Sequence, residues 1–274
     1  MTDALPGRLV LLGHPVSHSL SPVFQNAALR RADIALVYEA LDVAPEALDD
    51  TLARLVAQRA AGNVTIPHKD AVFRACQVTS AVAARAEAVN TFWVDDLGRL
   101  SGDNTDVAGF DALADHVGVE RAGAIVACIG SGGAAAAVCT AVERWPGATL
   151  RLYGRSSGRS AALANRFPAT VQLADSPADA LRGATTVVNA TPIGMRDDAL
   201  PVPVDELPRD ARVMDLVYRP GETRWVREAR RAGHLALDGC EMLLQQGAAA
   251  FERWFHRPAD IVVMREALAR ASRR

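Results

Sequence analysis

Long apolar runs are missing from this 274-residue sequence, and none approaches the ~20 residues that a membrane-spanning helix needs. Cysteine is scarce: Cys76, Cys128, Cys139 and Cys240 show no metal-site spacing, which predicts free thiols in a reducing cytoplasm. No basic segment followed by a long apolar stretch opens the chain, so we expect no signal peptide. Excess charge is also absent, because the net charge is −2, so neither nucleic acid nor an anionic membrane is expected as a partner.

The middle of the chain contains short apolar strands that alternate with helices. Hydrophobic residues make up 50% of the sequence, and its length suits two modest domains or one large one. We expect strands at 124–129, 149–153, 170–173, 186–189, 212–216 and 234–237, and helices at 134–144, 160–167, 177–182 and 223–232. Six such strands predict a doubly wound parallel sheet of the Rossmann type.

The front third alternates in the same way, which predicts an α/β fold of two domains. Strands are expected at 8–12, 36–41 and 63–66, a hairpin at 91–94 and 100–101, and helices at 21–31 and 45–58. We place the domain boundary near Asp106. The helical stretch from Gly239 is expected to return to the front domain. The N-terminal α/β domain is then 1–106 completed by 239–274, and the nucleotide domain is 107–238.

A glycine-rich loop, Gly130-Ser131-Gly132-Gly133-Ala134, follows the first strand of the nucleotide domain and opens a helix. Glycine lets the backbone approach a pyrophosphate, and a helix N-terminus favours its negative charge. Gly130, Gly132 and Ala135 match the dinucleotide fingerprint G-x-G-x-x-G/A. A tight structural turn would also explain the loop, but its six-strand context favours nucleotide binding.

The second strand of this domain ends at Tyr153 without the acidic residue that NAD-binding folds usually carry there. The segment 151–174 contains four arginines and no acid, and Arg155 and Arg159 lie in its first loop. Because the planar guanidinium suits a phosphate, this loop predicts a pocket for the 2′-phosphate of NADP. The alternative is a solvated basic loop.

Two motifs in the front domain end in residues suited to proton transfer. Lys69 ends the run 63–69 (NVTIPHK) at a strand-to-loop turn, and Asp106 ends the run 102–106 (GDNTD) at the expected start of a helix. A fold that brings them together would make a pair able to move a proton to or from a substrate hydroxyl. With a dinucleotide loop downstream, the pair suggests hydride transfer at an alcohol carbon.

The loop 13–22 (GHPVSHSLSP) contains three serines and two histidines. Ser21 is expected to cap a helix with Pro22 at its first position. Close hydroxyl groups suit a polyhydroxylated or carboxylated ligand. The four-residue spacing of His14 and His18 would suit a metal only on a helix, so no metal site is expected.

These pieces together resemble the shikimate dehydrogenase family over nearly the whole chain, and the motifs occur in the family's order. The matching runs are SLSP (19–22), NVTIPHK (63–69), AVNT (88–91), GDNTD (102–106), the glycine loop, NATPIGM (189–195), DLVYRP (215–220) and DGCEMLLQQG (238–247). The resemblance implies an NADP-dependent oxidoreductase of aromatic amino acid biosynthesis. Such an enzyme reversibly reduces 3-dehydroshikimate to shikimate in the cytoplasm, as a monomer or a homodimer.

The resemblance also implies residue roles. Lys69 is expected to be the acid/base residue, with Asp106 as its partner and as a ligand of a substrate hydroxyl. The remaining substrate contacts are expected from Ser19, Ser21, Thr65, Asn90, Tyr218 and Gln246. The NADP site is expected to involve Gly130, Ser131, Gly132, Gly133, Ala134, Gly154, Arg155, Ser156, Arg159, Thr191, Leu216, Gly239 and Met242. Simpler interpretations are a turn cap for Asn90, a core side chain for Tyr218 and a helix-surface position for Gln246.

Three residues depart from the family pattern. Gly154 stands where many members have Asn, Glu241 where a second glycine is usual, and Pro192 where serine is common. The first weakens the case for strict NADP preference, and a carboxylate at 241 that faces the nicotinamide would disturb cofactor binding. Pro192 is expected to stiffen its loop.

Three alternatives stay open at this point. They are a quinate/shikimate dehydrogenase with broader substrate or NAD use, a nucleotide-binding regulatory relative without turnover, and a different reductase with the same layout. The missing acid after Tyr153 argues against NAD use, and the presence of both Lys69 and Asp106 argues against a relative without turnover. The Ser19/Ser21 loop argues against a different reductase.

Overall fold

The computed structural model describes residues 5–219 and 221–271. Residues 1–4 and 272–274 of the predicted N-terminal domain, and Pro220 of the run 215–220, lie outside the described residues. Two compact units make up the chain: the first extends to Asp106 and resumes at Leu243, and the second is Val107–Met242. Each unit is built on its own six-stranded sheet.

The sheet of the first unit has the strand order β2-β1-β3-β5-β6-β4. Its strands are β1 (Leu9–Gly13), β2 (Tyr38–Asp42), β3 (Ala61–Val64), β4 (Val78–Thr79), β5 (Thr91–Val94) and β6 (Leu100–Asp103). β1 pairs in parallel with β2 and β3, whereas β5 runs antiparallel to both β3 and β6. The sequence of β1, LVLLG, is buried throughout, as expected for a strand covered on both faces.

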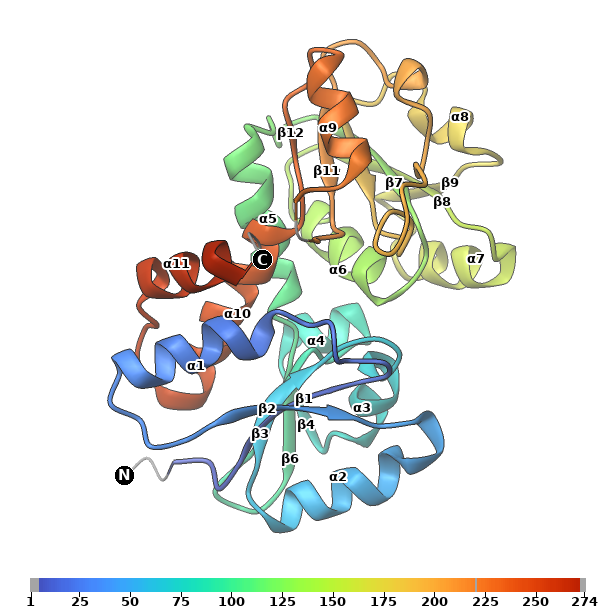
Figure 1. Ribbon diagram of the computed structural model, residues 1–274. Coiled ribbons are helices and arrows are strands. Elements are labelled where there is room, and N and C mark those ends of the chain that lie inside the picture. The colour runs from blue at the N-terminus through green and yellow to red at the C-terminus, as the bar shows by residue number, and fades with distance from the viewer. Residues whose placement is uncertain (1–4, 220, 272–274) are drawn as a thin grey trace. The chain divides into compact units, whose positions relative to one another are not determined.

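Helices from both ends of the chain complete the first unit. They are α1 (Ser21–Arg31), the 3₁₀ turn η1 (Pro45–Ala47), α2 (Leu48–Ala57), α3 (Lys69–Ala75), α4 (Ala81–Ala86), the later part of α10 (Cys240–Phe255), and α11 (Ile261–Ala271). α11 packs against α1, as the blue and red ribbons in Figure 1 show. The buried Gln25 of α1 donates to the carbonyl of Gly247 in α10 at 2.8 Å. The C-terminal segment therefore packs against the N-terminal part of the chain.

The sheet of the second unit is entirely parallel and has the order β12-β11-β10-β7-β8-β9. Its strands are β7 (Ile125–Ile129), β8 (Thr149–Tyr153), β9 (Val171–Leu173), β10 (Thr186–Asn189), β11 (Arg212–Asp215) and β12 (Ala236–Leu237). Numbered from β7, this is the 3-2-1-4-5-6 order of dinucleotide-binding folds, read from the opposite edge. The predicted doubly wound sheet is confirmed.

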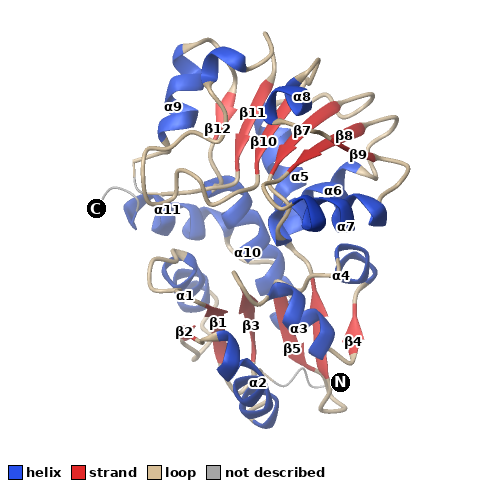
Figure 2. Ribbon diagram, turned by 90° about the vertical axis from the view of Figure 1, so that its right-hand side faces the viewer, coloured by secondary structure: helices blue, strands red, loops and turns tan. Residues whose placement is uncertain are grey.

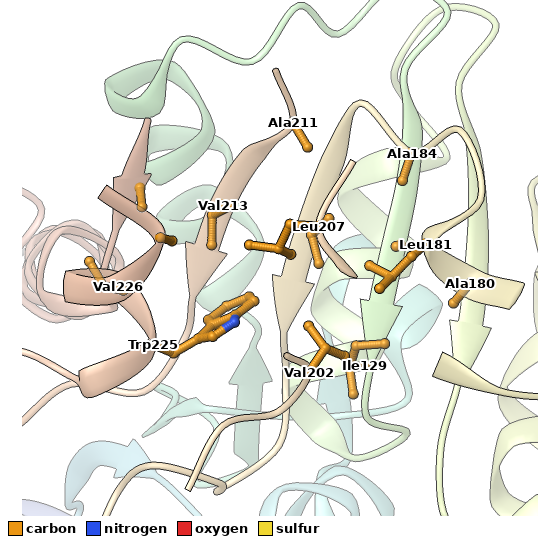
Figure 3. Close-up of a cluster of buried hydrophobic side chains, with 14 residues drawn as sticks. Ile129, Ala180, Leu181, Ala184, Val202, Leu207, Ala211, Val213, Trp225 and Val226 are labelled. Atoms are coloured by element: carbon orange, nitrogen blue, oxygen red, sulfur yellow. The ribbon is translucent and has the colours of Figure 1, made fainter. Parts of the chain in front are cut away.

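Helices line both faces of this sheet, as Figure 2 shows. They are α6 (Gly133–Val142), α7 (Ser157–Arg166), α8 (Pro177–Leu181) and α9 (Arg224–Arg231), with the turn η2 (Val204–Glu206) and with α5 (Asp106–Val117), whose first residue ends the first unit. Trp225 and Val226 of α9 lie over Val213 of β11 in one apolar core (Figure 3). Within the described residues, no helix combines the length and apolar character needed to cross a bilayer.

The structure differs from the sequence prediction between residues 69 and 86. This segment holds α3, the short strand β4 and α4, none of which was predicted. Lys69, predicted to end a turn, instead begins α3. The N-cap prediction for Ser21 is also wrong: Leu20 occupies the cap, and Ser21 is the first helical residue. The Ser19 hydroxyl accepts from the Ser21 N–H at 3.2 Å. The side chain that bonds the first helical N–H is therefore that of Ser19 and not that of Ser21.

Candidate active site and cofactor loops

Lys69 and Asp106 form a close ion pair in the first unit. Lys69 Nζ donates to Asp106 Oδ2 at 2.5 Å, and the side chains are only 15% and 8% exposed. Each residue is the first of its helix, α3 and α5. A carboxylate in the first turn is favoured by the positive end of the helix dipole. The folded chain thus holds an amine and a carboxylate within proton-transfer distance.

A buried amide fixes the carboxylate of this pair. Asn90 Nδ2 donates to Asp106 Oδ1 at 2.8 Å and to Thr105 Oγ1 at 3.0 Å, and it lies 3.3 Å from Gln246 Oε1. The side-chain oxygen of Asn90 accepts from the Thr105 N–H at 2.7 Å. Asn63 Nδ2 in turn donates to the Asn90 backbone carbonyl at 3.1 Å. One Asp106 oxygen therefore bonds Asn90 and the other bonds Lys69, which orients the carboxylate.

The structure brings together four of the predicted residues of the first unit: Lys69, Asp106, Asn90 and Gln246. Gln246 is buried, which excludes the helix-surface interpretation. No hydrogen bond among the described residues joins Ser19, Ser21 or Thr65 to this cluster. Instead, Gly13 approaches Thr65 so closely that a Cβ at 13 would collide with Thr65 Cγ2.

The glycine loop of the second unit has the features that a pyrophosphate needs. Gly130 has φ of +124°, and a Cβ there would lie 2.6 Å from the carbonyl oxygen of Ala190. Gly132 is the N-cap of α6, where no side chain caps the helix, and none of the described atoms lies within 4 Å of a Cβ built at 132. The first N–H groups of α6 are therefore left for an anion beside open space.

The arginine loop lies between β8 and α7, and its guanidinium groups are exposed. Ser156 caps α7 by accepting from the Arg159 N–H, and Arg155 and Arg159 are exposed on either side of it. Among the described side chains, no acidic group pairs with either arginine. Unpaired guanidinium groups beside the end of β8 fit a phosphate, so the residues present suit NADP.

The surroundings of position 154 explain why glycine fits there. A Cβ at 154 would lie 2.6 Å from both Ser131 Oγ and Ser160 Oγ. The two hydroxyl groups thus fill the space that a larger residue needs. Any side chain at 154 would have to displace them.

The other predicted cofactor residues lie at the carboxyl ends of β10, β11 and β12. Thr191 Oγ1 donates to Asn189 Oδ1 at 2.6 Å, and a Cβ at Gly239 would collide with the Leu216 carbonyl oxygen. Met242 is buried in α10, and Tyr218 is half-buried in the second unit. Pro192 is exposed, and its carbonyl accepts from the Met195 N–H at 3.1 Å, which closes the loop as a turn.

Glu241, the departure from the usual glycine, is buried and lies 3.5 Å from His116 Nε2. Both residues belong to the second unit, Glu241 in the first turn of α10 and His116 in the last turn of α5. The positive end of the helix dipole favours a carboxylate in a first turn, so the N-terminus of α10 stabilises Glu241.

Burial determines the protonation state of three of the cysteine thiols. Burial raises the pKa of Cys76 and of Cys240 to about 12, and that of Cys128 well above its ordinary value, so these thiols are protonated at neutral pH. Across 5–219 and 221–271, no group of three or more His, Cys, Asp or Glu residues is arranged to hold a metal. His14 Nδ1 lies 2.6 Å from Asp42 Oδ1 instead.

Sequence reasoning did not single out several residues that support these sites. Thr105 bonds Asn90 in the first unit. Asp103 accepts from Arg253 at 2.5 Å and from Ser80, which ties α10 and α4 to β6. Asn189 and Asp215 do the same for loops of the second unit. Each of these residues lies in one of the motifs that match the family. Their roles could not be predicted, because the residues that they bond are distant in the sequence.

Comparison with known proteins gives family matches at both ends of the chain. The sequence-family model of the shikimate dehydrogenase substrate binding domain matches residues 11–92. The family model of the shikimate 5′-dehydrogenase C-terminal domain matches residues 239–269. The shikimate dehydrogenase (NADP(+)) of Symbiobacterium thermophilum is 40% identical over 97% of this chain and 95% of its own length. That of Rubrobacter xylanophilus is 42% identical over 94% of each chain.

A solved structure extends the likeness to three dimensions. Shikimate 5-dehydrogenase from Thermus thermophilus, determined in complex with NADP(H) and shikimate, is 37% identical. It superposes with a TM-score of 0.86 over 96% of this chain and 99% of that one. With two relatives at 40% identity or more over nearly their whole length, the chain belongs to the shikimate dehydrogenase family.

Proposed function

We propose that this protein catalyses the reversible reduction of 3-dehydroshikimate to shikimate with NADPH, as an oxidoreductase acting on a CH–OH group. The observation that carries the proposal is the Lys69–Asp106 pair at 2.5 Å, held by Asn90 in the unit that matches a shikimate dehydrogenase substrate binding domain. Relatives at 40% identity or more that are named NADP(+)-dependent shikimate dehydrogenases support the same reaction.

In this proposal Lys69 holds and moves the proton. It protonates the oxygen that becomes the new hydroxyl, and it accepts that proton in the reverse direction. Asp106 keeps the amine oriented through Oδ2, while Asn90 holds Oδ1. Asp106 is also proposed as a ligand of a substrate hydroxyl. Because the pair is mostly buried, water competes little for the proton.

The remaining substrate contacts are proposed from two places. Ser19, Ser21 and Thr65 offer hydroxyl groups near the start of α1 and after β3, which suit the carboxylate of the substrate. Asn90, Gln246 and Tyr218 are proposed to contact its ring substituents. The substrate domain of this proposal is 1–106 completed by the C-terminal helices, and the NADP domain is 107–238.

The second unit supplies the proposed NADP site. Bound NADPH would supply the hydride that reduces the carbonyl carbon. The glycine loop 130–134 and the N-terminus of α6 would hold the pyrophosphate, and Gly154, Arg155, Ser156 and Arg159 the adenosine ribose and its 2′-phosphate. Thr191, Leu216, Gly239 and Met242 would line the remainder of the cofactor.

The direct test is an assay of the purified protein with shikimate or quinate, against NADP or NAD, following the reduced cofactor. We expect the highest kcat/KM with shikimate and NADP. A preference for quinate or NAD would favour the broader dehydrogenase, and binding without turnover would favour a regulatory relative. Arg74→Ala is the matched control for a Lys69 variant, because Arg74 lies on α3 but pairs with Asp70 at its exposed surface.

We also propose a cytoplasmic location and a monomeric or homodimeric state. None of the four cysteines, all of which lie in the described part of the chain, is in a disulfide, which is consistent with a reducing compartment. Cell fractionation tests the location, and light scattering during gel filtration gives the mass in solution.

A further inference from the structure

Asn189 and Asp215 are fully buried polar residues that the proposed mechanism does not use. They are the last residues of the neighbouring strands β10 and β11 and face each other in register. Two residues before each stands a core valine, Val187 and Val213, so the polar pair ends an otherwise apolar face of the sheet. A buried polar pair at this place requires an explanation beyond packing.

Asn189 bonds the loop that follows its own strand through three contacts. Its side-chain oxygen accepts from the Thr191 N–H at 3.0 Å and from the Thr191 hydroxyl at 2.6 Å. Its amide donates to the Ile193 carbonyl at 3.1 Å and to Asp215 Oδ1 at 2.8 Å. All hydrogen-bonding groups of this side chain are therefore occupied, three by the loop and one by the next strand.

Asp215 bonds the next loop and the helix beyond it. Oδ1 also accepts from the Val217 N–H at 3.0 Å, and Oδ2 accepts from the hydroxyl of Thr223, which is the N-cap of α9, at 2.8 Å. Burial, with a smaller contribution from the nearby Asp238, raises the pKa of Asp215 to about 6 against these hydrogen bonds. At neutral pH the residue is thus a buried carboxylate whose hydrogen-bond partners all donate.

The two loops are also tied at their outer ends. Arg219 Nη1 donates to the carbonyls of Gly194 at 3.3 Å and Asp197 at 2.7 Å. The segments 191–197 and 216–219 are therefore linked at the strand ends by Asn189 and Asp215 and at the rim by Arg219. Thr191 and Leu216, both proposed cofactor contacts, lie within this linked pair.

We propose that Asn189 and Asp215 are positioning residues that hold the loops after β10 and β11 in the conformation that binds NADP. The inference rests on the proposed NADP site. Asn189 sets the position of Thr191, and Asp215 sets the position of the backbone around Leu216 and the start of α9. Neither residue needs to touch the cofactor, because their hydrogen bonds fix the positions of the loops that contact it.

The test measures the Kd of NADP by calorimetric titration of the purified protein, together with its melting temperature and its Kd for shikimate. Asn189→Ala and Asp215→Ala are each expected to raise the Kd of NADP about tenfold, because each loses bonds that fix a loop. Shikimate binding is expected to stay unchanged. Asp215→Asn keeps the side-chain shape and an oxygen for the Asn189 and Val217 donors, so it should restore most of the affinity.

Val213→Ala is the matched control, because it removes buried atoms from the same face of β11 without touching the network. It is expected to lower the melting temperature while leaving the Kd of NADP at the wild-type value. If Asn189→Ala and Asp215→Ala lower the melting temperature but bind NADP normally, the network is only structural and the inference is wrong.

Two further results keep the inference separate from the proposed function. Wild-type protein that fails to bind NADP would refute the proposed function itself. If Asp215→Ala does not fold, Asn189→Ala and Asp215→Asn test the inference. A normal Kd of NADP in Asn189→Ala overturns the inference. A raised Kd in Asn189→Ala, together with a nearly normal Kd in Asp215→Asn, supports it.

Discussion

The two candidate sites are built from opposite materials. In the first unit, the ionic and amide side chains Lys69, Asp106 and Asn90 are themselves the site, and they bond one another directly. In the second unit, glycines and helix N–H groups form the proposed site, while the polar side chains Asn189 and Asp215 are buried at the ends of β10 and β11. Changes to the ion pair of the first unit should therefore alter the rate of chemistry, and changes to the cofactor loops of the second unit should alter cofactor affinity.

Lys69→Ala should break this contrast most strongly on the side of chemistry. We expect kcat to fall by ~10²–10⁴-fold, the usual contribution of a proton-transfer group, with little change in the Kd of NADP. Single-turnover kinetics with shikimate measures the chemical step. Asp106→Ala should cost a similar factor, and the double variant should lose no more than either single one, because the pair acts as a unit. A kcat close to that of the Arg74→Ala control would remove Lys69 from its role.

Replacing Arg155 and Arg159 together by alanine should change affinity and leave chemistry intact. The ratio of kcat/KM for NADP over NAD is expected to fall roughly 10- to 100-fold, since charge-assisted contacts to the 2′-phosphate are lost. Activity with NAD should be unchanged. An unaltered ratio would mean that this exposed loop does not read the 2′-phosphate, and a wild-type preference for NAD would overturn the assignment.

The pH dependence of stability tests whether Asp215 is a buried charge behind the cofactor loops. Its folded-state pKa is raised to about 6 from the ordinary 3.8, so the folded protein holds this proton more tightly than the unfolded chain. Relative to Asp215→Asn, the wild type should therefore lose stability as pH rises from about 4 to about 6, by about 3 kcal/mol in all. Denaturant titrations of both proteins across that range measure the difference, and parallel curves would contradict it.

Gly132→Ala sharpens the contrast, because it separates the cofactor surface from the fold. Its backbone suits alanine and a Cβ there meets no described atom within 4 Å, so the melting temperature should stay at the wild-type value. The Kd of NADP should nevertheless rise about tenfold, because the methyl group occupies space beside the α6 N-terminus. Val213→Ala is the opposite control, because it removes buried core atoms away from this loop and should lower the melting temperature while leaving the Kd of NADP unchanged.

The smallest effect is expected from the serine loop of the first unit. Ser19 bonds the start of α1, so Ser21→Ala is the cleaner substitution. The lost hydroxyl should raise the KM for shikimate by about three- to fivefold with kcat unchanged, because carboxylate binding acts equally on ground and transition states. An effect confined to the KM for NADP would mean that this loop does not bind the substrate.

How much the sequence could predict depended on the range of the interaction. The bounds of α1, β5, β8 and β10 follow from local pattern alone and were predicted. The short helices α3 and α4 were missed, although the five-residue helix α8, which begins with a proline, was predicted. The prediction that Lys69 meets Asp106 depended on family resemblance, since nothing local specifies a pairing across 37 positions.

The buried supports could not be predicted for the same reason. Asn189 and Asp215 meet only because β10 and β11 pair in a particular register, and a shift of one residue would separate them. The N-cap prediction for Ser21 was wrong for a more local reason: serine followed by proline is a good capping signal, but Leu20 occupies the cap and Ser21 is already helical.

The close approach of Gly154 to Ser131 and Ser160 has a consequence for how this sequence can evolve. An asparagine at 154, common in the family, would collide with hydroxyl groups that glycine accommodates. The replacement therefore requires the side chains of Ser131 and Ser160 to rotate away or to be exchanged for smaller ones. The effect of a substitution at 154 is therefore expected to depend on which residues stand at 131 and 160, so these three positions should change together.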